Sequence, residues 1–156
     1  MNLKTQQKFM KHCLNLAEKA LALGNPPVGS ILVYENRIIG EGIESGKSTG
    51  DITNHAEILA VRDAISKGNK ALLKDAAMLS THEPCIMCSY LIRHHKIPNI
   101  IFGTAVDFIG GCTSEFKVLE TESVPKWEAK PTIIKGVLEN ECLDLNRRFI
   151  ELLNSK

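Results

Sequence analysis

The chain has 156 residues, of which 44% are hydrophobic and 24% are charged, and its formal net charge at pH 7 is +1. This length and composition suit one globular domain, residues 1–156, whose core would bury about two thirds of the surface of the unfolded chain. The apolar runs are far shorter than the ~20 residues of a membrane span, and so small a net charge gives no overall field that would attract nucleic acid.

Residues 1–23 predict an opening helix, because apolar residues recur at helical spacing from Phe9 to Leu21. Lysines, His12 and other polar residues interrupt this stretch, so it lacks the continuous apolar centre of a secretory signal, and we expect a cytoplasmic protein. The sequence GNPP then ends the helix, because Gly24 suits a helix terminus and a residue before proline avoids the helical region.

Two short β-branched runs, VGSILVY (28–34) and RIIGEGI (37–43), predict a β-hairpin whose turn lies at Glu35 and Asn36. Beyond it the pattern predicts, in order, a loop at 42–54, a helix from His55 to about Gly68, a strand at 76–81, a helix at 85–95, strands at 99–103 and 131–137, and a helix at 139–153. No repeat or linker divides the chain, so these elements predict one α/β unit of about five strands.

The order strand, helix, strand, helix, strand between Arg37 and Gly103 makes two successive crossover connections. If these strands run parallel and advance in one direction, right-handed connections place both helices on the same face of the sheet. Both helices then begin at the same edge, outside the carboxyl ends of the strands, where open α/β sheets bind their ligands.

Three metal-ligating side chains converge at this edge of the predicted sheet. His55 begins the first of the two helices, and Cys85 and Cys88 occupy the first turn of the second at positions i and i+3. Two thiolates and one imidazole leave one position of a tetrahedral Zn²⁺ open, which distinguishes a catalytic zinc from a structural zinc with four protein ligands. Glu57 is not needed as a ligand, and its carboxylate can take a proton from a zinc-bound water and pass it to a leaving group.

Five cysteines form an odd number, which disfavours a secreted disulfide framework and favours reduced thiols. Taken alone, Cys85-x-x-Cys88 could be a redox pair or half of a structural zinc site, and the chain could then be a non-catalytic zinc-stabilised interaction module. An intact Glu57 beside an open coordination position argues against that alternative. The sequence assigns no functional role to four further residues of these types: His82, His94, His95 and Cys112.

The motifs HAE (55–57) and PCIMC (84–88), in this helix and strand context, resemble those of the cytidine and deoxycytidylate deaminase superfamily. The most similar branch holds bacterial tRNA adenosine deaminases, guanine deaminases and fungal-type cytosine deaminases, and the resemblance covers nearly the whole chain. It implies a three-layer α/β/α sandwich with a mixed five-stranded sheet, one zinc ion per chain and a homodimer or higher oligomer. It also implies His55, Cys85 and Cys88 as zinc ligands, Glu57 as the proton shuttle, and substrate contacts from backbone groups near Ala56 and Glu83.

One position departs from the pattern of these relatives, in which the loop after the second strand usually carries an asparagine that pairs with the base or sugar. Here Glu44 stands at the best-matching position. An ionised carboxylate accepts hydrogen bonds but does not donate them, so it suits a ring edge rich in N–H donors. We therefore expect a small nucleobase-like substrate such as guanine, isocytosine, cytosine or an aminotriazine, whose ring C–NH₂ becomes C=O with release of ammonia. Asn54 or Asp51 could make this contact in place of Glu44, and Asp107 and Phe108 are further candidate contacts.

The alternative is a tRNA-specific adenosine deaminase that forms inosine at the wobble position. Such enzymes tend to end in a basic, aromatic helix that grips the anticodon stem, whereas the closing residues RRFIELLNSK contain only Arg147, Arg148 and Lys156 as basic residues. This short basic tail and the near-neutral charge favour a small ring over tRNA, although GGCTSEF (110–116) resembles the tRNA-editing branch.

Overall fold

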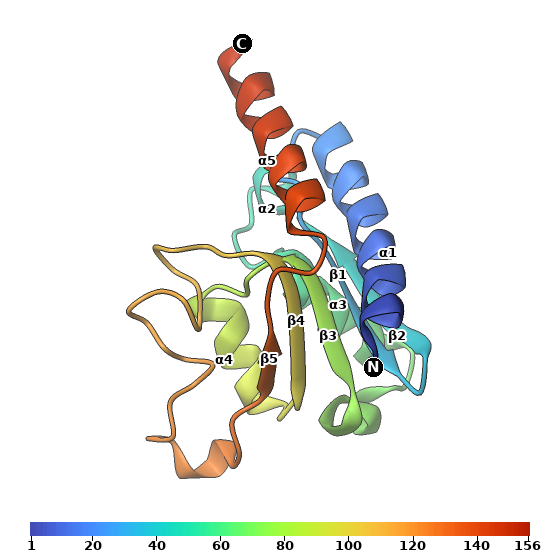
Figure 1. The fold of residues 1–156 in the computed structure, drawn as a ribbon, viewed down its shortest axis with the longest axis vertical. Helices are drawn as coiled ribbons and strands as arrows, with labels where there is room; N and C mark the ends of the chain where they lie inside the picture. The colour runs from blue at the N-terminus through green and yellow to red at the C-terminus, as the bar shows by residue number, and fades with distance from the viewer.

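A computed structural model describes all 156 residues of the protein and contains a central sheet with helices on both faces (Figure 1). The predicted helices and strands are all present, and short helical turns are added between them. In chain order the elements are α1 (Leu3–Ala22), β1 (Gly29–Tyr34), β2 (Arg37–Ile43), α2 (Gly46–Thr49), α3 (Ala56–Ser66), η1 (Lys70–Asp75), β3 (Ala77–His82), α4 (Ile86–His94), β4 (Asn99–Thr104), η2 (Pro125–Trp127), β5 (Thr132–Ile134) and α5 (Glu139–Asn154).

The five strands form one mixed sheet, as expected, and their order in it is β2-β1-β3-β4-β5. β1 pairs antiparallel with β2 and with β3, whereas β3, β4 and β5 run parallel. The turn between β1 and β2 is tight because Glu35 and Asn36 adopt positive φ values of 47° and 60°, a backbone geometry that matches the twist of a hairpin. β2 and β3 therefore point in the same direction with β1 between them, and α3 connects them across β1.

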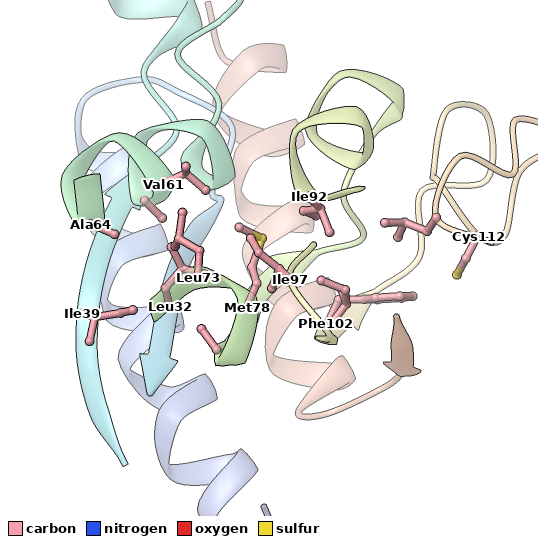
Figure 2. Packing of buried hydrophobic residues seen from close by; sticks show 14 residues of the cluster. Leu32, Ile39, Val61, Ala64, Leu73, Met78, Ile92, Ile97, Phe102 and Cys112 are labelled. Carbon is pink, nitrogen blue, oxygen red and sulfur yellow. The ribbon is translucent and has the colours of Figure 1, made fainter. Parts of the chain in front are cut away.

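Helices cover both faces of the sheet and give the three layers that were predicted. α1 and α5 lie on one face, and α3 and α4 lie on the other (Figure 1). Figure 2 shows the core of the second face, where Val61 and Ala64 of α3 and Ile92 of α4 point toward Leu32 and Met78 of the sheet. This packing holds α3 and α4 side by side with their N-termini at the same edge of the sheet.

α3 lies close against β2 because two glycines of this strand face it. A Cβ atom added to Gly42 would lie 2.4 Å from the carbonyl oxygen of Ala56, and one added to Gly40 would lie 2.5 Å from that of Ala60. Real Cβ atoms do not approach a backbone oxygen so closely, so a larger residue at either position would push α3 away from the sheet. The two glycines thus fix the position of the helix start, where His55 lies.

The structure differs from the predicted elements in the loops and at the last strand. The 42–54 loop contains the short helix α2, and the strand predicted at 131–137 is reduced to β5. Between β4 and β5, residues 105–131 form a long segment whose one helical element is η2. Its backbone groups must therefore be satisfied largely by turns and side chains in place of a helix or a strand ladder.

No helix of the structure combines the length and the apolar character that are needed to cross a lipid bilayer.

Candidate active site

Two helix starts bring three metal-ligating side chains together beyond the carboxyl end of β3. His55 is the N-cap residue of α3, and Cys85 is the N-cap residue of α4. The carbonyl oxygen of Cys85 accepts the first helical hydrogen bond of α4, from the backbone N–H of Ser89, so Cys85 and Cys88 flank the same first turn, as predicted. Nδ1 of His55 lies 3.5 Å from Sγ of each cysteine, and the three ligand atoms all lie within 4.8 Å of one another.

This geometry fits a tetrahedral zinc ion. Zinc–sulfur bonds of about 2.3 Å and zinc–nitrogen bonds of about 2.0–2.1 Å at the tetrahedral angle place sulfur and nitrogen about 3.6 Å apart. The separation between the imidazole of His55 and each thiol, 3.5 Å, is close to this value. Three protein ligands leave a fourth position for solvent or substrate, so these residues can hold one catalytic zinc ion.

Hydrogen bonds within the triad already favour one thiolate. The pKa of Cys85 is lowered to about 4, because Cys88 and His55 donate hydrogen bonds to it, although burial opposes this shift. The same contact raises the pKa of the Cys88 thiol far above its ordinary value, and the hydrogen bond to Cys85 raises the pKa of His55 to about 9. Zinc binding would therefore release the protons of Cys88 and His55.

Glu57 lies in the first turn of α3 beside the triad, and only 4% of its surface is exposed. Oε1 accepts a hydrogen bond from Oγ of Ser80 at 2.9 Å, and Oε2 lies 3.4 Å from Sγ of Cys88. Burial raises the pKa of Glu57 to about 7. A carboxyl group with this pKa can both accept and release a proton near neutral pH, which is what a general acid–base residue requires.

A small cleft opens beside Glu57 and His55. Its volume is about 180 Å³, below the roughly 300–1,000 Å³ of pockets that enclose drug-sized ligands. A single nucleobase is therefore the largest group that the cleft is suited to enclose. Its apolar walls come from two parts of the chain: Pro26 and Val28, and Val106 and Ile109.

Glu44 is one of three acidic residues that line this cleft, together with Glu57 and Glu83. Glu44 is 8% exposed, and its Oε1 accepts a hydrogen bond from the backbone N–H of Gly46 at 3.1 Å. Burial raises the pKa of Glu44, while the positive charge of His55 and backbone hydrogen bonds from Gly46 and Ala56 oppose this shift. The carboxyl group is thus fixed by the backbone at the start of α3.

Asn54 and Asp51, the two other candidates for the contact of Glu44, lie outside the cleft. The amide of Asn54 donates to Oγ1 of Thr49, and the carboxylate of Asp51 accepts from the backbone N–H and the hydroxyl of Thr53. Both side chains are therefore used to shape the loop, and of these three candidates Glu44 alone reaches the site.

Asp107 and Phe108 are also outside the cleft, since both are exposed and Phe108 retains 87% of its surface. Their chain neighbours Val106 and Ile109 form the cleft wall in their place. A substrate contact by Asp107 or Phe108 stays a prediction.

Glu83 supports this wall with its side chain, a role that the sequence did not reveal. Its carboxylate accepts hydrogen bonds from the backbone N–H groups of Val106, Cys112 and Thr113 at 2.9, 2.9 and 2.7 Å, and from the hydroxyl of Thr113. Gly110 passes so close that an added Cβ would lie 2.2 Å from the carboxylate. Burial raises the pKa of Glu83, but these hydrogen bonds outweigh burial and keep its pKa below the ordinary value.

Ser80 and His82 of β3 were not predicted as site residues. Strand alternation could have identified Ser80, because it lies two residues after Met78, which packs against the helices of the same face. His82 lines the cleft, and burial lowers its pKa to about 4 although Asn146 of α5 hydrogen-bonds to it, so the imidazole is neutral. Cys112 packs into the core, where burial raises its pKa to about 12.

Comparisons with known proteins indicate one family. The family model for the cytidine and deoxycytidylate deaminase zinc-binding region matches residues 3–104. The tRNA-specific adenosine deaminase of Streptococcus pyogenes is 30% identical over 148 residues, which cover 95% of this chain and 91% of the relative. That of Aquifex aeolicus is 36% identical over 129 residues, which cover 81% of this chain and 85% of the relative.

Solved structures match the fold over most of its length. One from a study of A-to-I editing by tRNA:A34 deaminases at the wobble position of transfer RNA has a TM-score of 0.80 and 28% identity, over 88% of this chain and 98% of that chain. A mutant of NE0047 in complex with 8-azaguanine has a TM-score of 0.78 over 94% of this chain and 85% of that chain. Its identity is 18%, so this second likeness concerns the fold alone.

Replacing Glu83 by glutamine tests its role as the anchor of the cleft wall. Glutamine presents an N–H₂ group to backbone donors, so we expect Glu83→Gln to lower the free energy of unfolding by about 1–3 kcal/mol at neutral pH. Because the folded pKa is depressed, the contribution of Glu83 is present above the ordinary carboxyl pKa of 4.5 and is lost as pH falls through the folded value. Urea denaturation as a function of pH measures both effects. The matched control is Glu115→Gln, at an exposed carboxylate of the same segment, and equal effects of the two changes would contradict the assignment.

Proposed function

The chain belongs to the cytidine and deoxycytidylate deaminase family, and on this premise we propose that it is a zinc-dependent hydrolytic deaminase that converts adenosine in tRNA to inosine. The observation that carries this proposal is the meeting of His55, Cys85 and Cys88 with Glu57 in a chain that shares 30–36% identity with tRNA-specific adenosine deaminases over most of its length. The reaction consumes one water at C6 of the purine and releases the exocyclic amine as ammonia.

Each residue of the site has a separate role in this reaction. A zinc ion held by His55, Cys85 and Cys88 would supply an activated water whose pKa is reduced to about 7. Oε2 of Glu57 takes one proton from the attacking water and passes it to N1 of the ring, and it then carries the second proton, from the added hydroxyl, to the departing amine. Ser80 fixes Oε1 of the same carboxylate at 2.9 Å, so the second oxygen stays directed at the reacting atoms.

The size of the cleft sets how the substrate enters. A volume of about 180 Å³ accommodates the base, while ribose and phosphates stay outside. An adenosine of tRNA must therefore be unstacked and turned into the cleft, which costs least in a single-stranded loop. Burial of the base between Val28 and Val106 would also exclude bulk water from Glu57.

The proposal reverses the preference drawn from the sequence, which favoured a free ring over tRNA. The two arginines of the tail already have carboxylate partners in this fold, since Arg147 pairs with Asp144 and Glu151, and Arg148 pairs with Glu18 at 2.7 Å. The identity with tRNA deaminases outweighs this feature, because it extends over the whole fold and not only over the zinc motifs.

Glu44 favours a second candidate, deamination of a free base such as guanine, isocytosine, cytosine or an aminotriazine. Its buried carboxylate lines the cleft and would be well paired by a ring that offers adjacent N–H donors. Adenine offers ring nitrogen acceptors on the same edges, so it pairs with Glu44 only if the carboxyl is protonated.

The proposal includes a cytoplasmic homodimer. All five cysteines are free, as suits a reducing compartment. α4 exposes two large apolar side chains one turn apart on the same side, with Ile86 at 37% and Tyr90 at 51%. Exposed apolar residues grouped in this way are typical of a surface that another protein chain covers.

Changing Glu57 to glutamine tests the mechanism. We expect Glu57→Gln to retain zinc and the fold, because glutamine still accepts the hydrogen bond of Ser80, and to lose inosine formation by about 10²–10⁴-fold or more. Single-turnover assays with tRNA, together with metal analysis of both proteins, measure this. Unchanged turnover in the variant would remove Glu57 from the mechanism, and Glu115→Gln serves as the control for the same chemical change at the surface.

A substrate panel separates the two candidates. The unaltered protein should form inosine in a tRNA with adenosine at the wobble position and release little ammonia from guanine, isocytosine, cytosine or an aminotriazine. Ammonia from a free base with no inosine in tRNA would favour the second candidate. In that case Glu44→Gln should reduce ammonia release by about tenfold or more, because an unmatched buried polar group costs about 1–3 kcal/mol.

A further inference from the structure

Five cationic or titratable side chains line one groove at the end of the molecule opposite the zinc site. The groove has a volume of about 700 Å³ and lies between η1 and the C-terminal ends of α3 and α4. Two short pieces of chain supply these side chains: Lys70 and Lys74 come from η1, and His94, His95 and Lys96 come from the end of α4.

Most of this positive charge has no anionic partner in the protein. Lys96 pairs with Glu128 at 2.6 Å, whereas Lys70 and Lys74 form no ion pair and are exposed. Asp75, the acidic residue next to them in the chain, lines a different hollow. The groove is therefore a local concentration of positive charge on a protein whose net charge is only +1.

Helix capping does not account for these cations. Lysines near a helix C-terminus often hydrogen-bond to its last carbonyl groups. Here backbone N–H groups already do so, from Gly68 to Ile65 for α3 and from Ile97 to Ile92 for α4. The side chains of Lys70 and Lys74 make no hydrogen bond to either helix end, so their ammonium groups remain free to bind an external anion.

The cations of the groove also act on one another. The pKa of His95 is lowered by burial and, in addition, by the positive charges of His94 and Lys70. Lys70 stands 24 residues before His94 in the chain, so the fold itself brings these like charges together. Such a cluster costs electrostatic free energy unless an anion is bound in the groove.

The groove and the active site are joined by the same two helices. α3 has 11 residues and rises about 1.5 Å per residue, so it carries the chain roughly 16 Å from the zinc ligand His55 to the groove. A small substrate in the cleft cannot reach so far, whereas the backbone of a folded RNA can contact both places at once.

We propose that the groove lined by Lys70, Lys74, His94, His95 and Lys96 binds the phosphodiester backbone of the RNA whose adenosine enters the cleft. This inference rests on the proposed function for the identity of the RNA. Lys70 and Lys74 are the principal phosphate contacts. Lys96 already pairs with the carboxylate of Glu128, and the imidazole of a histidine is in general a weaker base than the amine of a lysine.

A pair of matched double variants tests the proposal. Lys70→Gln/Lys74→Gln removes two charges from the groove, and Lys4→Gln/Lys8→Gln removes two exposed charges with the same spacing from α1. Binding of a fluorescent tRNA anticodon stem-loop is measured by anisotropy over a range of salt concentrations, and inosine formation is measured separately. The groove variant should bind about tenfold more weakly at low salt, and the slope of log K against log salt should fall by about two, one for each lysine. The α1 variant should bind like the unaltered protein.

The possible results lead to distinct conclusions. Equal weakening in both variants would mean that only the general charge matters, and unchanged binding in the groove variant would mean that RNA lies elsewhere; either result overturns the proposal. Inosine formation by the unaltered protein together with unchanged binding of the groove variant would leave the proposed function intact. Weakened binding of the groove variant without any inosine formation would support the groove and overturn the proposed function.

Discussion

The approach of two helix N-termini at the end of β3 is the constraint on which the rest of the structure depends. Glycines in β2 let α3 start against the sheet, and Cys85 begins α4 directly beside it. The ligand atoms are thereby held within 4.8 Å of one another before any metal is bound. Helix N-termini also favour anionic groups, which suits thiolates and the carboxylate of Glu57. The catalytic arrangement is therefore a direct product of how the helices pack.

The fold distributes charged side chains unevenly over the protein, and the net charge does not show this. The net charge of +1 suggested no attraction for nucleic acid, yet it averages over regions that differ strongly. Arg147 and Arg148 are neutralised by carboxylates of α5 and α1, whereas the lysines of η1 are not. A negatively charged polymer would therefore meet a positive potential at the groove and little at the C-terminal tail, although a linear reading of the sequence directs attention to the tail.

The mixed sheet and its three layers were implied by the family resemblance, whereas the helices, the strands and the zinc ligands could be predicted from local spacing. The hydrophobic periods predict the helices and about five strands, and the interval between His55 and Glu57 together with the Cys85-x-x-Cys88 pair predicts the zinc site. The position of Val106 in the cleft could not be predicted, because the 105–131 segment has no periodic pattern and is held by the carboxylate of Glu83. The groove could not be predicted either, because its lysines and histidines come from separate elements and meet only in the folded chain.

The central claim is that this chain holds one zinc ion with three protein ligands and an open fourth position. Zinc analysis combined with zinc K-edge X-ray absorption of the purified protein tests it most directly. The account predicts one zinc per chain with two sulfur ligands at about 2.3 Å and the remaining ligands nitrogen or oxygen. A third or fourth sulfur ligand, or zinc that remains fully bound in Cys88→Ser, would contradict the account and make the ion a structural one held elsewhere.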